Sequence, residues 1–299
     1  MEGFRFSPFT FILSSSSSLP LLGSTLRGGF GHIFRHLVCL KRGDSCASCI
    51  LKYTCPYSYI FQTPLPPNSH LFSRTRDIPR PYIIDLSGEG SSFNLVLVGK
   101  GIDYLPYFVL VFDALGKRGL GREKNKFMLK EVKDGERKLV YSQKEGALYS
   151  SFKIYTWKDF QNPQPVSRLA LHFLSPLRLK IKNKLLSSLT FPLLIKSLSR
   201  RISLLSEFHC GQSLWNSLQN LFPLAEKIKI IEEKFLWHDI MRYSTRQKRK
   251  MKLGGIKGRI VVEGELTPFL PLLRIGEYIH VGKGTTFGLG KYRLEILKK

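Results

Sequence analysis

The feature that most constrains the fold of this chain is a pattern that occurs once in each half. An apolar stretch with helical periodicity is followed by a basic, glycine-rich turn and then by a strand-like stretch. The first copy spans residues 104–115, 116–122 and 126–132, and the second spans residues 268–280, 282–290 and 291–297. The repetition indicates a duplicated unit, and because the copies are too far apart for a solenoid, we expect tandem domains.

Each half also opens with a strand and a helix, and strand-like stretches follow before the repeated pattern. In the first half these are residues 4–13, 21–38, 82–86 and 93–98; in the second they are residues 168–174, 191–208 and 256–264. The order β-α-β-β-α-β predicts an α+β protein of two tandem ferredoxin-like (RRM-like) domains. A Pro-rich linker at residues 161–165 gives domains 1–163 and 164–299, with residues 138–151 as a candidate added hairpin.

The charge of the chain restricts its partners. Its 299 residues include 47 Lys and Arg against 22 Asp and Glu, a formal net charge of +25. Such a surface repels itself unless a polyanion shares it, so we expect nucleic acid or an anionic membrane. No apolar stretch reaches the roughly 20 residues of a membrane span. Residues 4–22 lack the basic start and the cleavage pattern of a signal peptide, so we expect a cytoplasmic protein.

The cations are concentrated in three stretches. Between Asp239 and Glu263 no acidic residue occurs, and residues 178–184 carry cations with a period of two, which predicts one face of an extended strand. The third stretch flanks the first glycine-rich turn. The cations concerned are Arg242, Arg246, Lys248, Arg249, Lys250, Lys252, Lys257 and Arg259; Arg178, Lys180, Lys182 and Lys184; and Arg118, Arg122, Lys124 and Lys126. Together they predict a track for RNA phosphates whose affinity falls steeply with salt.

The second glycine-rich turn admits two interpretations. Glycines let a backbone come close to phosphates, and successive N–H groups form an anion nest. The alternative is a tight helix-to-strand turn, and the string is not a Walker A loop. The residues concerned are Gly282, Lys283, Gly284, Gly288 and Gly290.

Four cysteines form a cluster with six, two and five residues between them: Cys39, Cys46, Cys49 and Cys55. A cytosolic protein does not keep these as disulfides, so metal ligation is favoured. Zinc is the first choice; an iron–sulfur cluster, suggested by Cys55-Pro56, and four buried free thiols are the alternatives. No open coordination position is implied, so the expected role is structural. Cys210 stands apart and is interpreted as a core residue.

Four segments in this order resemble the CRISPR-associated repeat-processing endoribonucleases. They are residues 26–32 (LRGGFGH), the cysteine cluster, residues 242–247 (RYSTRQ) and residues 280–290 (HVGKGTTFGLG). The resemblance implies ferredoxin-like domains of the repeat-associated RNA-binding superfamily. It also implies metal-independent cleavage of precursor CRISPR RNA within its repeats, giving guide RNAs with a repeat-derived 5′ handle. Members of the family commonly carry a catalytic histidine in the first helix.

The residues can be interpreted for that chemistry. Metal-free cleavage makes the 2′-OH attack the adjacent phosphate, which needs a group of near-neutral pKa and cations for the charged phosphorane. With Leu26, Phe30, Ile33 and Leu37 facing a core, His32 falls on the opposite face of the first helix, near two glycines that would let RNA approach. Solvated surface histidines are the alternative. The companions expected at this helix are Arg27, Gly28, Gly29, Arg35 and His36.

His280, beside the glycine string, is the rival catalytic candidate, with a helix-capping residue as its alternative. Tyr243 and Lys41 are candidate helpers, and His172 is interpreted as a satisfied core residue. The few carboxylates show no cluster typical of a two-metal nuclease.

Three functions therefore remain. The first is an endoribonuclease that acts on CRISPR repeat RNA without a catalytic cofactor. The second is a non-catalytic RNA-binding subunit that joins other subunits of a CRISPR effector complex, because such subunits share the fold and the glycine string. The third, a zinc protein associated with ribosomes or tRNA, does not explain the duplicated glycine-rich turns.

Overall fold

The computed structural model describes residues 3–15, 19, 23–41, 43, 45–66, 78–86, 88, 91–161, 164–181, 184–244 and 249–298, with the backbone alone at 242–244 and 249–251. The chain forms two compact units. The N-terminal unit comprises Phe6–Ile154 and Phe208–Cys210, and the C-terminal unit comprises Tyr155–Glu207 and Gly211–Lys299 with the first residues up to Arg5. The domain boundary at residue 163 stays a prediction.

The N-terminal unit has the predicted strand and helix order. Its main elements are β1 (Arg5–Ser14), α1 (Gly23–Val38), β2 (Tyr82–Asp85), β3 (Ser92–Val98), α2 (Leu105–Arg118) and β4 (Met128–Asp134). The antiparallel sheet runs in the order β2-β3-β1-β4-β5-β6, which places the first strand between the third and the fourth. The added strands β5 (Leu139–Ser142) and β6 (Ala147–Leu148) pair with each other, which confirms the hairpin expected over residues 138–151.

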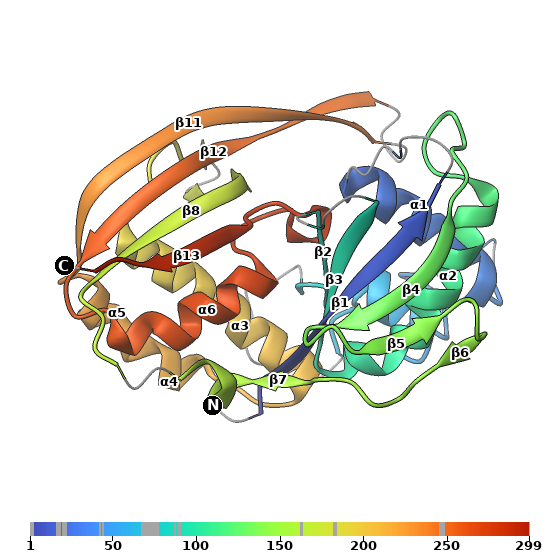
Figure 1. Cartoon of the computed structure of the whole chain (residues 1–299), viewed down its shortest axis with the longest axis horizontal. Coiled ribbons are helices and arrows are strands. Elements are labelled where there is room, and N and C mark those ends of the chain that lie inside the picture. The colour runs from blue at the N-terminus through green and yellow to red at the C-terminus, as the bar shows by residue number, and fades with distance from the viewer. Residues whose placement is uncertain are drawn as a thin grey trace. The chain divides into compact units, whose positions relative to one another are not determined.

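Both helices cover one face of this sheet (Figure 1). Alternate residues of β1, Phe9, Phe11 and Leu13, point into the core that α1 and α2 complete, as the period of two in a strand requires. Between the first helix and β2 lies a short π-helix, η1 (Ser58–Gln62), and a 3-10 helix, η2 (Gly99–Tyr104), precedes α2.

The C-terminal unit repeats the arrangement. It contains β8 (Arg168–Leu177), α3 (Phe191–Cys210), α4 (Trp215–Gln219), α5 (Leu221–Ala225), β11 (Lys229–Ser244), β12 (Arg249–Glu263), α6 (Leu270–Ile279) and β13 (Tyr292–Ile296). The sheet order β11-β12-β8-β13 is the counterpart of β2-β3-β1-β4. The duplicated unit is therefore present, but β11 was not expected from the sequence. Its alternation is obscured by consecutive charged residues such as Glu232 and Glu233.

Two local expectations were wrong. Residues 178–184 do not form one extended strand: β9 (Lys180–Ile181) pairs antiparallel with β10 (Lys184–Leu185), so the period of two does not place the cations on one face. Leu37 does not join the core, because it is 51% exposed in the last turn of α1.

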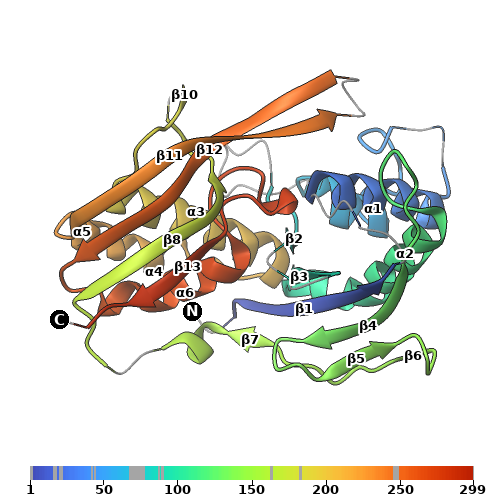
Figure 2. The same ribbon diagram turned by 45° about the horizontal axis from the view of Figure 1, so that its top comes forward.

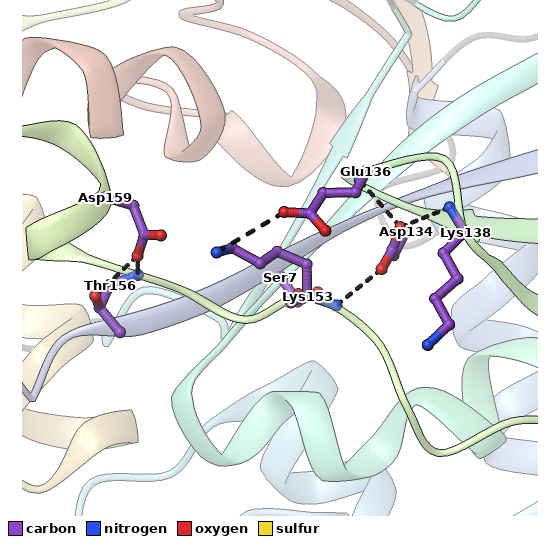
Figure 3. A network of polar contacts seen from close by, with 7 residues as sticks. All are labelled: Ser7, Asp134, Glu136, Lys138, Lys153, Thr156 and Asp159. Atoms are coloured by element: carbon purple, nitrogen blue, oxygen red, sulfur yellow. Dashed lines mark hydrogen bonds and ion pairs between the residues drawn. The ribbon is translucent and has the colours of Figure 1, made fainter.

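One buried carboxylate organises the end of the N-terminal sheet (Figure 3). Asp134 is 3% exposed and accepts hydrogen bonds from the backbone N–H groups of Glu136 (3.0 Å), Lys138 (2.9 Å) and Lys153 (2.8 Å). The carbonyl of Lys153 in turn accepts a hydrogen bond from the Ser7 hydroxyl at 2.6 Å. These bonds fix the turn after β4 and attach the end of the unit to β1.

Several short elements complete the C-terminal unit. The strand β7 (Tyr155–Thr156) leads into a 3-10 helix, η3 (Trp157–Phe160), which begins with a capping box made by Thr156 and Asp159. A further 3-10 helix, η4 (Thr267–Phe269), precedes α6, and η5 (Thr285–Phe287) lies within the second glycine-rich turn. In the described residues, no helix has the length and apolar character that a membrane span requires.

The packing of α1 depends on Phe30. Its ring stacks on Phe108 at 4.7 Å and on Phe112 at 5.6 Å, and it also meets Tyr82 at 5.8 Å. Aromatic rings packed in this way stabilise the folded state by more than the burial of their surface alone, because the ring quadrupoles attract one another.

Replacement of Phe30 by Ala should lower the free energy of unfolding of the N-terminal unit by about 3–5 kcal/mol, because it leaves a cavity among these rings. Leu110→Ala on α2 is the control, since Leu110 is 61% exposed. Urea titration followed by circular dichroism measures both. Equal effects of the two substitutions would contradict the assigned core.

Candidate nucleic-acid interface

The first helix separates its polar and apolar side chains as predicted. Phe30, Ile33 and Phe34 are buried, whereas His32 and His36 are exposed. Arg35 is half-buried, and its pKa is raised, first by a hydrogen bond with the Cys39 side chain. The outer face of α1 thus presents two imidazoles, and the Arg35 guanidinium lies on the neighbouring part of the helix surface.

Three glycines of α1 serve different purposes. A Cβ atom at Gly31 would lie 2.4 Å from the ring of Phe61, and one at Gly29 would lie 2.9 Å from Leu115. These two glycines are needed for close packing. At Gly28, however, a Cβ atom would meet nothing within 4 Å, and the residue is exposed.

Gly28 therefore has no packing reason to be glycine, although a glycine inside a helix costs about 1 kcal/mol relative to alanine. It lies four residues before His32, so both share one face of the helix. The missing side chain leaves the helix backbone open to a ligand directly beside an exposed imidazole.

The other predicted residues at this helix differ in their surroundings. Arg27 is half-buried, and its guanidinium carbon lies 4.3 Å from the centroid of the Phe61 ring. Lys41 is exposed just beyond the end of α1. Phosphate contact by either residue stays a prediction.

The first glycine-rich turn displays its cations. Gly119 and Gly121 have φ values of 94° and 76°, which L side chains rarely adopt, and residues Leu120 and Asn125 form a small antiparallel bridge. The basic side chains around this turn are all exposed: Arg118, Arg122, Lys124 and Lys126.

The second glycine-rich turn is held by backbone hydrogen bonds, both within the turn and to the residues at the end of β8. Gly290 donates to the carbonyl of Pro176 (3.1 Å) and accepts from Val281 (3.1 Å), while Lys283 donates to the carbonyl of Arg178 (2.9 Å). All four glycines, Gly282, Gly284, Gly288 and Gly290, have φ between 72° and 86°. Gly288 and Gly290 are buried, which favours the tight-turn interpretation for them. Gly282 and Gly284 are half-buried, and Lys283 is exposed.

His280 closes this turn from within. It is fully buried, adopts the left-handed φ of 59°, and its Nδ1 donates to the carbonyl of Leu289 at 3.2 Å. A histidine without exposed surface cannot touch a bound RNA in this conformation. His280 occupies the C-cap position of α6, but its ring bonds to a carbonyl of the turn and not to a helix carbonyl, and its burial does not favour the catalytic role, which stays a prediction.

The basic stretch after Asp239 belongs to a long two-stranded ribbon. β11 and β12 pair from Lys229 and Glu263 to Ser244 and Arg249, whereas β8 pairs with β12 only from Ile256 onward. The ribbon therefore extends past the rest of its sheet (Figure 2). Arg246 and Lys248 lie outside the described residues. Arg242, Tyr243, Arg249 and Lys250 are placed in the ribbon by backbone alone.

The ribbon supplies counter-charges that the linear stretch lacks. Lys252 lies 3.7 Å from Asp239 across the two strands, and Arg259 lies 3.6 Å from Glu232. Strand pairing therefore brings carboxylates from β11 to the cations of a stretch that has none of its own. The Lys252–Asp239 pair is largely exposed and worth little to stability, so a phosphate can compete for Lys252.

Sequence reasoning missed the aromatic part of this ribbon. Trp237 is 48% exposed, and Leu236 opposite Lys257 is 80% exposed. Exposed aromatic rings beside cations are typical of surfaces that stack on single-stranded nucleic acid. Leu236 and Trp237 are visible in the sequence, but their exposure can be recognised only once these residues are assigned to the strand β11.

The cations of residues 178–184 fall into two groups. Arg178 is half-buried, donates to the carbonyl of Gly254, and has a pKa lowered by burial. It connects β8 to β12 and has a structural role. Lys180 and Lys184 are exposed, and Lys182 lies outside the described residues.

Two further histidines have structural partners. His172 Nε2 lies 2.8 Å from Glu295 on the neighbouring strand β13 and is half-buried rather than in the core. His209, which carried no recognisable pattern, is 4% exposed; Nε2 donates to the carbonyl of Pro79 at 2.8 Å, so Nδ1 accepts from the hydroxyl of Tyr59 at 2.9 Å.

The four clustered cysteines line one cavity of about 20 Å³ together with Lys41, Lys52, Tyr57 and Ser58. Within the part of the chain that the structure describes, no three His, Cys, Asp or Glu side chains are already arranged around a common metal position.

Comparison with known proteins identifies relatives of both parts. Residues 4–152 match the family model AF_1859_N, an N-terminal domain, and residues 171–292 match the model of the CRISPR-associated endoribonuclease Cas6. The resemblance to the Cas6 endoribonucleases is thus confirmed for the C-terminal part of the chain, residues 171–292. An uncharacterized protein of Archaeoglobus fulgidus is 26% identical over 92% of both chains.

Solved Cas6 structures share the fold of this Cas6-like chain. A Cas6 of Thermus thermophilus in its product complex matches with a TM-score of 0.60 and 12% identity, covering 97% of this chain and 99% of that one. A second Cas6 product complex matches with a TM-score of 0.56 and 18% identity at the same coverage. At these identities the structural similarity establishes the fold alone. Any argument for function has to rest on the residues of this chain.

The different roles of the α1 glycines can be tested by thermal unfolding. Gly31→Ala should lower Tm by several degrees, because the Cβ atom overlaps Phe61 and overpacking costs about 1–3 kcal/mol. Gly28→Ala should keep or raise Tm, because it adds helix propensity of up to about 1 kcal/mol without a clash. A loss of Tm in Gly28→Ala would show that Gly28 is a packing residue after all.

Proposed function

We propose that this chain is a metal-independent endoribonuclease that cleaves precursor CRISPR RNA within its repeats. The observation that carries the proposal is the exposed His32 on the outer face of α1, one helical turn after the open Gly28. The Cas6 match over residues 171–292 and the Cas6 fold support the substrate class.

The reaction requires movement of protons and stabilisation of negative charge. The 2′-OH attacks the adjacent phosphate, which forms a 2′,3′-cyclic phosphate, and the bond to the 5′ oxygen breaks to leave a 5′-OH. An imidazole suits the proton transfers because its pKa is near neutral. His32 is the group that we assign to them, because its side chain is exposed, whereas His280 is fully buried.

Cations near α1 would stabilise the phosphorane. Arg35 lies in the last turn of α1, and Lys41 follows the end of the helix. A guanidinium or an ammonium close to the phosphate lowers the energy of the dianionic phosphorane. Tyr243 as a helper stays a prediction, since its side chain is outside the described residues.

The carboxylates fit poorly with a two-metal mechanism. Glu232 pairs with Lys234 and Arg259, and Glu295 pairs with His172, so each has a cation partner on its own sheet. Two-metal nucleases need several carboxylates around a common centre.

RNA binding would involve the exposed cations of both units. In the C-terminal unit these are Lys180, Lys184, Lys252, Lys257 and Lys283, and in the N-terminal unit they surround the first glycine-rich turn. Trp237 on the ribbon adds an exposed ring for base stacking.

The function is tested by incubating the full chain with a labelled repeat RNA in EDTA. Cleavage at one phosphodiester, with a cyclic phosphate and a 5′-OH at the new ends, is the expected result. RNA that is bound tightly but stays intact would favour the non-catalytic effector subunit and contradict the enzyme. RNA that does not bind would contradict both.

The role of His32 predicts that His32→Ala lowers the single-turnover cleavage rate by about 10²–10⁴-fold, the usual contribution of a general acid or base. Affinity for the repeat RNA should change little, since the imidazole acts on the reacting atoms. His172→Ala on β8 is the matched control and should cleave at the normal rate. Normal cleavage by His32→Ala would remove His32 from the mechanism.

Phosphate contact by the ribbon predicts a change in salt dependence. The plot of log Kd against log salt should become shallower by about 0.7 for each cation removed, because a single strand releases fewer counterions. This slope is measured for the variants Lys252→Gln and Lys257→Gln. Lys117→Gln on α2, outside the predicted contacts, is the control. An unchanged slope in both ribbon variants would exclude the ribbon from the RNA track.

A further inference from the structure

The segment between α1 and η1 has no hydrophobic core of its own. In residues 39–55, where 42 and 44 are not described, every side chain is exposed or half-buried and none is buried. Leu40 is 86% exposed and Ile50 is 81% exposed. A segment that turns its large apolar residues outward gains little stability from packing.

The inward-facing positions of this segment are mostly cysteines. Its half-buried residues are Cys39, Cys46, Cys49, Leu51, Lys52 and Cys55. Cys46 and Cys55 contact the edge of the main core, yet Leu40 and Ile50 of the same segment stay outside it, whereas purely apolar packing would bury the larger side chains first. The opposite arrangement is typical of small structures that a metal ion holds together.

The backbone brings the cysteines from three places. Cys39 extends α1, since its N–H donates to the carbonyl of Arg35 at 3.0 Å. Cys46 lies within a turn closed by Ser48 N–H and the carbonyl of Ser45 at 3.2 Å, and Cys49 directly follows this turn. Cys55 accepts from the N–H of Tyr59 at 3.0 Å and so begins the next helical turn.

The cavity that the four thiols line is small and surrounded by cations. Its volume of about 20 Å³ suits one atom-sized sphere, since a single water needs at least about 10–15 Å³. Lys41 and Lys52 line the same cavity, and they would balance the net charge of −2 on one divalent ion with four thiolates.

We propose that Cys39, Cys46, Cys49 and Cys55 bind one Zn²⁺ ion as a closed tetrathiolate site that fixes the segment to the end of α1. The four cysteines line one cavity, but in this conformation no three His, Cys, Asp or Glu side chains of the described residues are positioned to hold a metal ion, so the thiols have to move for binding. Binding draws them to the usual Zn–S distance of about 2.3 Å. No position is left for substrate, so the ion is structural and keeps the last turn of α1, with Arg35 and His36, in place.

The test measures metal content, which does not depend on any cleavage activity. The purified full chain is analysed for zinc and iron, and its zinc is then replaced by Co²⁺. One zinc per chain and the intense near-ultraviolet and visible bands of a cobalt tetrathiolate are expected. Iron with broad visible absorption would overturn zinc in favour of a cluster. Absence of metal, with all five thiols reacting freely or two disulfides formed, would overturn the site altogether.

Variants locate the ligands. Cys46→Ala should reduce bound zinc at least tenfold and lower Tm, and Cys49→Ala should do the same. Cys49→His should recover zinc, because imidazole nitrogen also binds Zn²⁺ in tetrahedral sites. Cys210→Ala, which changes the half-buried fifth cysteine at the end of α3, is the matched control and should keep one zinc per chain. Zinc retained by both Cys46→Ala and Cys49→Ala would contradict the proposal even if the chain contains the metal.

Discussion

The close packing of α1 against its neighbours determines the rest of the proposed site. Phe30 stacks within a set of aromatic rings, while Gly29 and Gly31 let Leu115 and Phe61 come close to the helix. With these contacts made, the rotation of α1 about its axis is fixed. The outer face must then carry His32 and His36, and Gly28 lies on it without any packing role.

The same α+β unit serves two purposes in this chain. In the N-terminal unit, the helix face presents imidazoles, whereas in the C-terminal unit the helix α6 and the turn after it bury His280 and use the glycines to close the backbone. The two glycine-rich turns also differ. The first displays exposed cations, and the second is largely a structural turn with Lys283 at its surface.

The sequence predicted the fold well wherever residues of one kind recur with a regular period. The apolar stripe of α1 and the alternation in β1 identified both elements, and the duplicated helix, turn and strand identified the repeat. The prediction failed where pairing partners decide the outcome. β11 was missed because charges interrupt its alternation, residues 178–184 reverse direction, and Asp239 meets Lys252 only across two strands. The sequence indicated both His32 and His280 as candidate site residues. It could not show that His280 is buried while His32 is exposed, because burial depends on tertiary packing.

The central claim is that RNA reaches the outer face of α1 beside His32. Imidazole NMR signals test this directly, with a repeat RNA that has 2′-deoxyribose at the cleavage position and so binds without reacting. At saturation the His32 signal should shift while the His172 signal, assigned through His172→Ala, stays in place. An unmoved His32 signal with RNA fully bound would contradict the account.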